Sequence, residues 1–234
     1  MIRKPQRKVI PLYAVLPLLL TAVSMLCSYQ AAKIYQLIFG FRDLMDLTLS
    51  VDLNIPFAPG WGWIYVGAFF FWAYQFITVA QDCPESAYKL SIADLSGKFL
   101  CLLFFLFLPT TNVRPEVNGT GLTALLMKII YALDSPTNLF PSIHCFVPWL
   151  GTRCMFGIKN HKHKGIHCTL SFIGTMLIFA STLFTKQHVF IDVLGGIAVA
   201  EIGLLVAKYS PLPRMLCSWN ESFVKTRLCK FLSF

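Results

Sequence analysis

The sequence has little charge. Only 13% of its 234 residues are charged, whereas 56% are hydrophobic. A water-soluble domain is closer to half apolar and a quarter charged. Too little polar surface remains to cover a globule, so we expect lipid to surround most of the chain. This composition argues against a water-soluble enzyme or binding domain.

Acidic residues are scarce, with 11 Asp and Glu against 20 Lys and Arg, and the net charge is +9. In a soluble protein this charge would suggest a nucleic-acid partner. Here the basic residues gather at the two ends of the chain and in the turn 159–164. This distribution is typical of cytoplasmic segments that touch anionic head groups. We therefore predict membrane lipids as partners and no nucleic acid.

Paired cysteines are also missing, because none of the eight cysteines forms a C-x-x-C motif and most lie in apolar stretches. Such cysteines behave as small hydrophobic residues, so neither a disulfide framework nor a zinc site is predicted. His161, His163 and His167 share a basic turn with no acid nearby, which favours a solvated loop over a metal site.

Six apolar runs have the length of a membrane span, about 20 residues. The first could be mistaken for a signal peptide, but it is too long for one and no A-x-A cleavage site follows. We predict an all-α, polytopic six-transmembrane-helix bundle over residues 9–207, with a basic cytoplasmic N-terminus (1–8) and a basic cytoplasmic tail (208–234). The expected spans are 9–29, 61–81, 91–108, 140–158, 166–184 and 188–207.

Loop charge predicts the orientation. An even number of spans places both termini and the basic turn 159–164 on the cytoplasmic side. The connections 30–60 and 109–139 carry no positive excess and are expected on the other side. The amphipathic stretch 122–133 within the second connection is a candidate interfacial helix.

Some charged residues fall inside the expected spans. Asp94 and Lys98 are four residues apart, so they can pair on one helix face. Glu201 lies toward the cytoplasmic end of the last span, where we expect a structural hydrogen bond to a neighbouring helix.

Three polar clusters, 110–115, 138–144 and 181–192, are expected on the non-cytoplasmic side. His188 and Asp192 would lie on one face of a helix, four residues apart. The carboxylate can accept one imidazole N–H and orient the other nitrogen toward a substrate, which makes His188 a candidate nucleophile. His144 is then a candidate general acid for a leaving oxygen.

The same clusters hold groups suited to an anion. Arg114 offers a fork of donors that matches phosphate oxygens, Lys186 a point charge and Ser142 a hydroxyl donor. Pro141 at the expected first turn of a span leaves backbone N–H groups free toward the same site.

These residues resemble the motifs of the type-2 phosphatidic acid phosphatase superfamily, which are K-x6-R-P, P-S-G-H and S-R-x5-H-x3-D. Arg114-Pro115 matches the end of the first, and the second reads P-S-I-H at 141–144. Ser181, His188 and Asp192 match the third at the same spacing. The segments T-T-N-V-R-P-E and N-L-F-P-S-I-H-C resemble its inositol phosphorylceramide synthase-like branch. The resemblance covers about residues 50–207.

The resemblance implies a six-helix bundle that cleaves a phospholipid or prenyl phosphate through a phosphohistidine on His188, oriented by Asp192, with His144 as the acid. It implies no metal and no cofactor. The phosphate would be bound by four residues: Arg114, Ser142, Lys186 and Ser181.

Two positions depart from the family pattern. Phe107 stands where the first motif has lysine, and Thr182 where the third has arginine. Two phosphate-binding cations are therefore missing, which favours the alternative of a non-enzymatic membrane transporter or scaffold that retains a degenerate phosphatase site. The motifs leave open whether an enzyme would transfer the phosphoryl group to water or to an alcohol.

Overall fold

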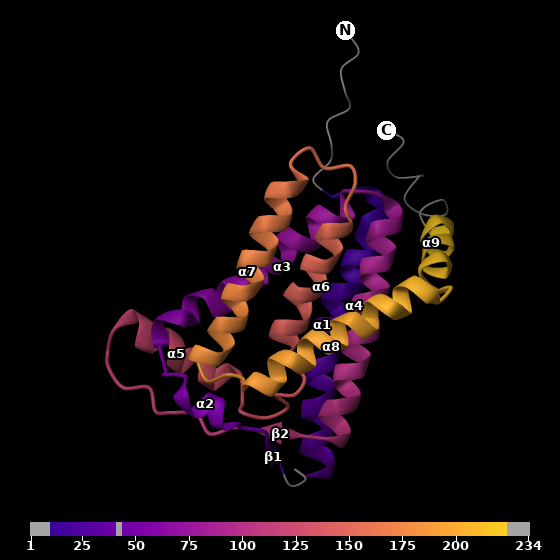
Figure 1. Cartoon of the computed structure of the whole chain (residues 1–234). Coiled ribbons are helices and arrows are strands. Elements are labelled where there is room, and N and C mark those ends of the chain that lie inside the picture. The colour runs from indigo at the N-terminus through magenta and orange to yellow at the C-terminus, as the bar shows by residue number, and fades with distance from the viewer. Residues whose placement is uncertain (1–9, 41–43, 224–234) are drawn as a thin grey trace.

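The computed structural model describes residues 10–40 and 44–223 (Figure 1). The protein is mostly helical, and four of the described helical segments are long and apolar enough to cross a membrane. These are Pro59–Ala80, Pro84–Phe107, Lys164–Phe184 and Phe190–Tyr209. They identify the chain as a membrane protein by length and composition.

The described helices are α1 (Leu12–Phe39), α2 (Ser50–Asn54), α3 (Gly62–Ala80), α4 (Pro84–Phe107), α5 (Leu122–Leu133), α6 (Ile143–Gly157), α7 (Lys164–Phe184), α8 (Phe190–Tyr209) and α9 (Leu212–Phe223). A 3₁₀ turn, η1 (Pro59–Trp61), leads into α3. Two short strands, β1 (Met45–Asp46) and β2 (Thr110–Thr111), pair in parallel.

The six-span bundle is not confirmed, because two of the expected spans are not among the four helical segments that are long and apolar enough to cross a membrane. The expected span 140–158 becomes α6, whose 15 residues extend only about 22 Å. The expected span 9–29 falls in α1, where the apolar stretch among the described residues is Leu12–Met25. The expected basic N-terminus lies outside the described residues, as does much of the tail.

Local signals explain where the helices begin. Pro84 occupies the first turn of α4, where its fixed φ and missing N–H suit a helix start. The helix therefore begins seven residues before the expected 91, and its polar first turns hold the Glu85–Lys89 ion pair at 2.6 Å. At α6, the hydroxyl of Ser142 accepts the N–H of Cys145 as an N-cap. The amphipathic helix expected at 122–133 is confirmed as α5.

Close backbone contacts hold α8 against its neighbours. It packs on α4 and α6, and α6 also packs on α3 and α7. A Cβ at Gly196 would lie 2.7 Å from the carbonyl oxygen of Ser142 and 2.9 Å from the amide nitrogen of Phe146. Gly203 meets the backbone of Ala93 in α4 just as closely. Glycine at these positions lets the backbones of α8 and its partners approach each other, as in other membrane helix packings.

Glu201 makes the expected structural contacts with a neighbouring helix. Its carboxylate accepts the indole N–H of Trp149 at 2.9 Å and pairs with the guanidinium of Arg153 at 2.7 Å. Both partners belong to α6, so the interaction links α8 to α6 near the end of the bundle opposite His188.

Asp94 and Lys98 form the expected pair, with Nζ 2.7 Å from Oδ2 and both side chains buried. The ammonium also donates to the carbonyl oxygen of Thr21 at 2.7 Å and to the hydroxyl of Ser24 at 3.2 Å. A buried charge is tolerated only when it is paired and hydrogen-bonded, so this cluster ties α4 to α1.

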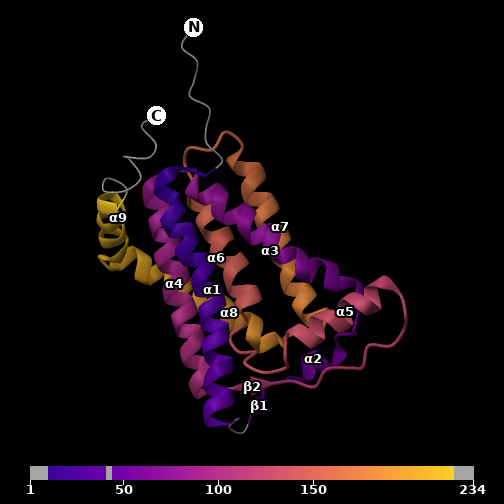
Figure 2. The same cartoon turned by 180° about the vertical axis from the view of Figure 1, so that it is seen from behind.

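The two ends of the molecule differ in structure (Figures 1 and 2). One end carries α2, α5 and the paired strands, and the other carries α9. The helix α9 was not expected, since the sequence indicated only a basic tail there. It is docked by Asn220, whose amide donates to the hydroxyl of Tyr88 and to the carbonyl oxygen of Tyr13, each at 2.9 Å.

Replacing Lys98 with methionine should lower the free energy of unfolding in detergent by about 3–5 kcal/mol, because Asp94 would be left buried without its counter-charge. The matched control is the double variant Asp94→Leu/Lys98→Met, which removes both charges and should recover most of the loss. Equilibrium unfolding followed by circular dichroism measures both. A double variant as unstable as the single one would contradict the explanation.

Candidate functional site

The three polar clusters expected at one membrane face meet in the structure. The amide of Asn138 donates to the carbonyl oxygen of Thr110 at 2.9 Å. The side-chain amide of Asn112 donates to the carbonyl oxygen of Lys186 at 2.9 Å. The clusters 110–115, 138–144 and 181–192 are thus connected through backbone hydrogen bonds, although up to about 80 residues separate them along the chain.

His188 and Asp192 form a hydrogen-bonded pair, with Nδ1 3.2 Å from Oδ2. His188 does not lie on a helix as expected; it precedes the N-cap residue Val189 of α8. The pair still forms because Oδ2 of Asp192 also accepts the N–H of Val189 at 3.0 Å, as acidic residues do in the first helical turn. A carboxylate can only accept here, so Nδ1 carries the proton and Nε2 keeps its lone pair.

His144 lies in the first turn of α6 among aromatic side chains of α3. Its ring stacks on Tyr65 at 4.1 Å between centroids and contacts Phe69 and Trp72. The centroid of His188 is 6.2 Å away. The Nε2 atom of His144 is buried and has no hydrogen-bond partner among the described residues. The two imidazoles therefore lie near each other at the starts of α6 and α8.

Tyr65 connects His144 to a second carboxylate. Its hydroxyl donates to Oδ2 of Asp134 at 3.0 Å and lies 3.3 Å from Nδ1 of His144. A hydroxyl has one proton, so Tyr65 can meet the imidazole only as an acceptor of Nδ1–H. Each histidine is thus held with its Nδ1 protonated, by Asp192 directly and by Asp134 through Tyr65. No local signal in the sequence marks the contact of Tyr65 with His144.

Arg114 is held by three groups around the site. Its guanidinium donates to Oε1 of Gln187 and to the carbonyl oxygen of Asp134, each at 2.5 Å, and lies over the ring of Tyr131. Burial raises the pKa of Tyr131 to about 12 although the Arg114 charge opposes the shift. The Tyr131 hydroxyl therefore stays protonated and donates to the carbonyl oxygen of Thr185 at 2.7 Å. Arg114 is thus held by Gln187, the residue that precedes His188 in the chain.

Lys186 is turned toward a residue that the sequence did not single out. Its Nζ donates to the carbonyl oxygen of Asp52 at 2.8 Å, and its backbone takes the left-handed region with φ of 54°. The buried carboxylate of Asp52 accepts the amide of Phe190 at 2.7 Å and that of Leu49 at 2.9 Å. Asp52 thereby fastens the loop before α3 to the start of α8. The signal available in the sequence was only an acidic residue that could lie in the first turn of a short helix.

The two predicted serines occupy different positions. Ser142 lies inside the site, where its amide donates to the carbonyl oxygen of Asp192 at 3.1 Å. Ser181 is fully buried in α7, and its hydroxyl donates to the carbonyl oxygen of Ile178 at 2.7 Å. Ser181 therefore stabilises the end of α7. Its hydroxyl proton is engaged by Ile178 and does not point to a phosphate as predicted.

The two departing positions differ in exposure. Phe107 is 67% exposed at the last turn of α4. Thr182 is fully buried, and its carbonyl oxygen accepts the amides of Gln187 and His188. Thr182 thus supports the backbone under His188 in a space that an arginine side chain would not fit without rearrangement.

Metal ligands are not clustered within residues 10–40 and 44–223, where no group of three His, Cys, Asp or Glu is placed to hold an ion. In the basic turn, the His161 ring lies edge-on to His167, whose Nδ1 is 2.7 Å from the Tyr74 hydroxyl.

Changing Tyr65 to phenylalanine should shift the tautomer ratio of His144 about fivefold toward Nε2–H, because the acceptor that favours Nδ1–H is lost. Nitrogen NMR of imidazole-labelled protein measures the ratio. Tyr74→Phe, which removes a hydroxyl next to His167 instead, is the matched control and should leave His144 unchanged. An Nε2–H tautomer of His144 in the unaltered protein would contradict the assignment.

Searches against protein-family models, curated proteins and solved structures found no match to this chain. The geometry described above therefore carries the functional argument.

Proposed function

We propose that the protein is an integral membrane lipid phosphatase or phosphotransferase that cleaves a lipid phosphoester through a phosphohistidine on His188. The observation that carries the proposal is the His188–Asp192 pair with His144 at 6.2 Å between ring centroids. The motif resemblance to the type-2 phosphatidic acid phosphatase superfamily points to the same chemistry.

The proposed reaction has two steps. Nε2 of His188 attacks phosphorus, an N–P bond forms, and the bond to the leaving oxygen breaks. Asp192 stabilises the positive charge that develops on the imidazole, and protonated His144 gives its proton to the leaving oxygen. In the second step His144 takes a proton from water or an alcohol, whose oxygen attacks phosphorus and releases His188. Water gives hydrolysis, and an alcohol gives transfer.

The spacing of the two histidines supports this sequence. Reacting atoms in a productive complex are about 3–3.5 Å apart. The ring centroids of His144 and His188 are 6.2 Å apart, so both imidazoles are near enough to contact one phosphoryl group in the proposed complex. The hydrogen bonds at each Nδ1 leave both Nε2 atoms for the substrate: the lone pair of His188 can attack phosphorus, and His144 must take up a second proton at Nε2 before it acts as the acid.

The charges around the site favour a phosphodiester over a phosphomonoester. Arg114 lies next to His188, whereas Lys186 donates to Asp52 and the expected cations are replaced by Phe107 and Thr182. A single nearby guanidinium balances one negative charge, which is the charge of a phosphodiester. A phosphomonoester carries close to two at neutral pH and would remain under-compensated.

The proposed setting is a six-span bundle in which α1 and α6 join the four helical segments that are long and apolar enough to cross a membrane. The site would open at the non-cytoplasmic face, with α5 lying along the interface as an amphipathic helix. The lipid chains would stay in the bilayer while the phosphate reaches His188. The loop charges and the position of α5 beside the site support this arrangement.

The alternative is a transporter or scaffold that retains a degenerate site. The replacement of two cations and the hydrogen bonds that already engage Arg114 favour it. The two functions differ in turnover: a scaffold would bind the lipid without releasing product.

The test is product release by the detergent-purified protein from phosphodiester and phosphomonoester lipids, with and without an alcohol acceptor. His188→Ala should abolish turnover, and His144→Ala should reduce it about 10²–10⁴-fold for leaving groups that need a proton. The phosphodiester should be the better substrate. A phosphorylated intermediate that is labile in acid should be trapped on the unaltered protein.

His163→Ala is the matched control, because His163 lies at the start of α7 near the other end of the bundle. It should retain full activity. Equal turnover by the unaltered protein and His188→Ala would refute the nucleophile, and lipid binding without turnover would favour the scaffold.

A further inference from the structure

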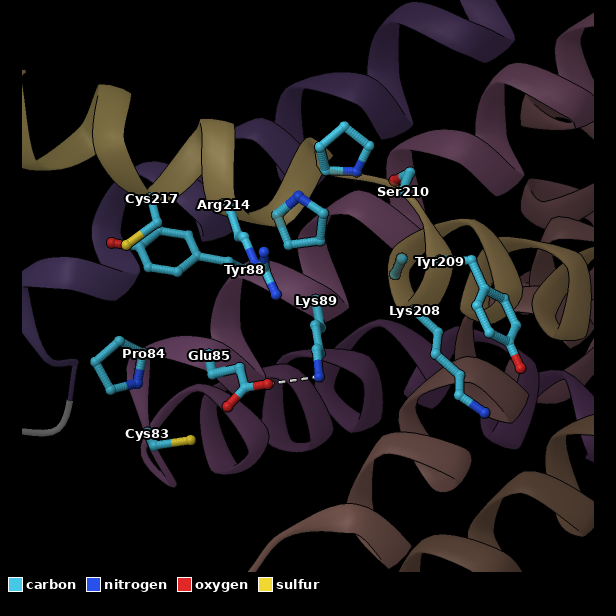
Figure 3. Close-up of a pocket in the computed structure, with 13 residues that line it drawn as sticks. Cys83, Pro84, Glu85, Tyr88, Lys89, Lys208, Tyr209, Ser210, Arg214 and Cys217 are labelled. Atoms are coloured by element: carbon cyan, nitrogen blue, oxygen red, sulfur yellow. Dashed lines mark ion pairs between the residues drawn. The ribbon is translucent and has the colours of Figure 1, made fainter.

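A pocket lies at the end of the bundle opposite the histidines. It has a volume of about 740 Å³ and is lined by the first turns of α4, the last turn of α8 and the first turns of α9 (Figure 3). Because α8 has 20 residues, the pocket is about 30 Å along this helix from His188. Its size falls within the usual range for small-molecule sites.

Basic side chains from three helices line this pocket. Lys89 comes from α4, Lys208 from α8 and Arg214 from α9, and Glu85 is the single carboxylate among the lining residues. Glu85 is already paired with Lys89 at 2.6 Å. In Figure 3 the Arg214 side chain extends from α9 toward Lys89. The lining therefore carries a positive excess that suits an anion.

Neutral groups in the lining add hydrogen-bonding capacity and rigidity. The hydroxyl oxygen of Ser210 is buried and has no partner among the described residues. Pro211 and Pro213 flank the turn between α8 and α9, which limits the conformations of the chain there. The ammonium of Lys208 lies 4.8 Å from the ring centroid of Tyr209, which positions the charge at the pocket rim.

The outer face of α9 is apolar next to the charged pocket. Leu212, Met215 and Trp219 are 41%, 59% and 67% exposed, and their spacing places them on one helix face. An exposed apolar stripe beside cations is typical of a helix that lies in a membrane interface. Asn220, near the opposite side, docks the helix to the bundle. The pocket mouth would then lie at the depth of lipid head groups.

We propose that this pocket binds the phosphate of an anionic phospholipid head group, with Arg214, Lys89 and Lys208 as the cations and Ser210 as a hydroxyl donor. The apolar face of α9 rests on the same leaflet. This site is separate from the histidine site and does not rest on the proposed function.

The test is native mass spectrometry of the full chain, released from nanodiscs that contain phosphatidylglycerol and phosphatidylcholine in equal amounts. Phosphatidylglycerol should be retained preferentially. Each cation near a lipid surface contributes about fivefold to affinity, so Lys208→Gln/Arg214→Gln should lower the retention by up to about thirtyfold. Circular dichroism checks that the variant remains folded.

The matched control is Lys162→Gln/Lys164→Gln, which removes two cations from the turn before α7, outside the pocket lining. Because this turn can touch anionic head groups without enclosing one, the control should lower phosphatidylglycerol retention much less than the pocket variant does. Ser210→Ala leaves the charge intact and should weaken retention by a smaller factor.

The competition arm uses inorganic phosphate during release. Persistent phosphatidylglycerol enrichment supports the lipid source. Saturable phosphate binding without lipid enrichment would overturn the head-group assignment, and equal losses in the pocket variant and the control would overturn the site itself.

Discussion

One carboxylate oxygen organises the start of α8, and the candidate site depends on it. Oδ2 of Asp192 accepts the amide of Val189, which is the N-cap of α8, and the imidazole N–H of His188, which precedes the helix. The carbonyl oxygen of the same residue accepts the amide of Ser142, so the first turns of α6 and α8 are held together. Asp192 therefore does more than orient His188. By binding Ser142 it also holds the two histidines at their observed distance.

Much of this arrangement could be predicted from the sequence because it depends on local patterns. The amphipathic period of 122–133 defines α5, and the four-residue spacing of Asp94 and Lys98 defines their pair. The starts of α4 and α8 differ from the predicted ones, because they depend on residues in the first helical turn. Polar residues after Pro84 concealed the first turns of α4, and the capping contact of Asp192 excludes His188 from the helix.

The rest of the site is built from contacts between distant segments, which no local pattern encodes. Asp52 supports the start of α8 from 138 residues earlier in the chain, and Tyr65 reaches His144 across 79 residues. The sequence placed Lys186 in the phosphate site because of its charge, but a left-handed backbone turns it to Asp52. The charge of a side chain is visible in the sequence, whereas its direction is set by the packing around it.

The close approach of α8 to α6 has a consequence for experiments that scan the chain. A methyl group at Gly196 would meet the backbone of Ser142 and Phe146, and one at Gly195 would meet the ring of Phe140. An alanine scan through α8 would therefore record losses at two residues that never touch a ligand. Substitutions at Gly195 and Gly196 would push α8 away from α6, and so move the two histidines apart, although neither histidine is changed.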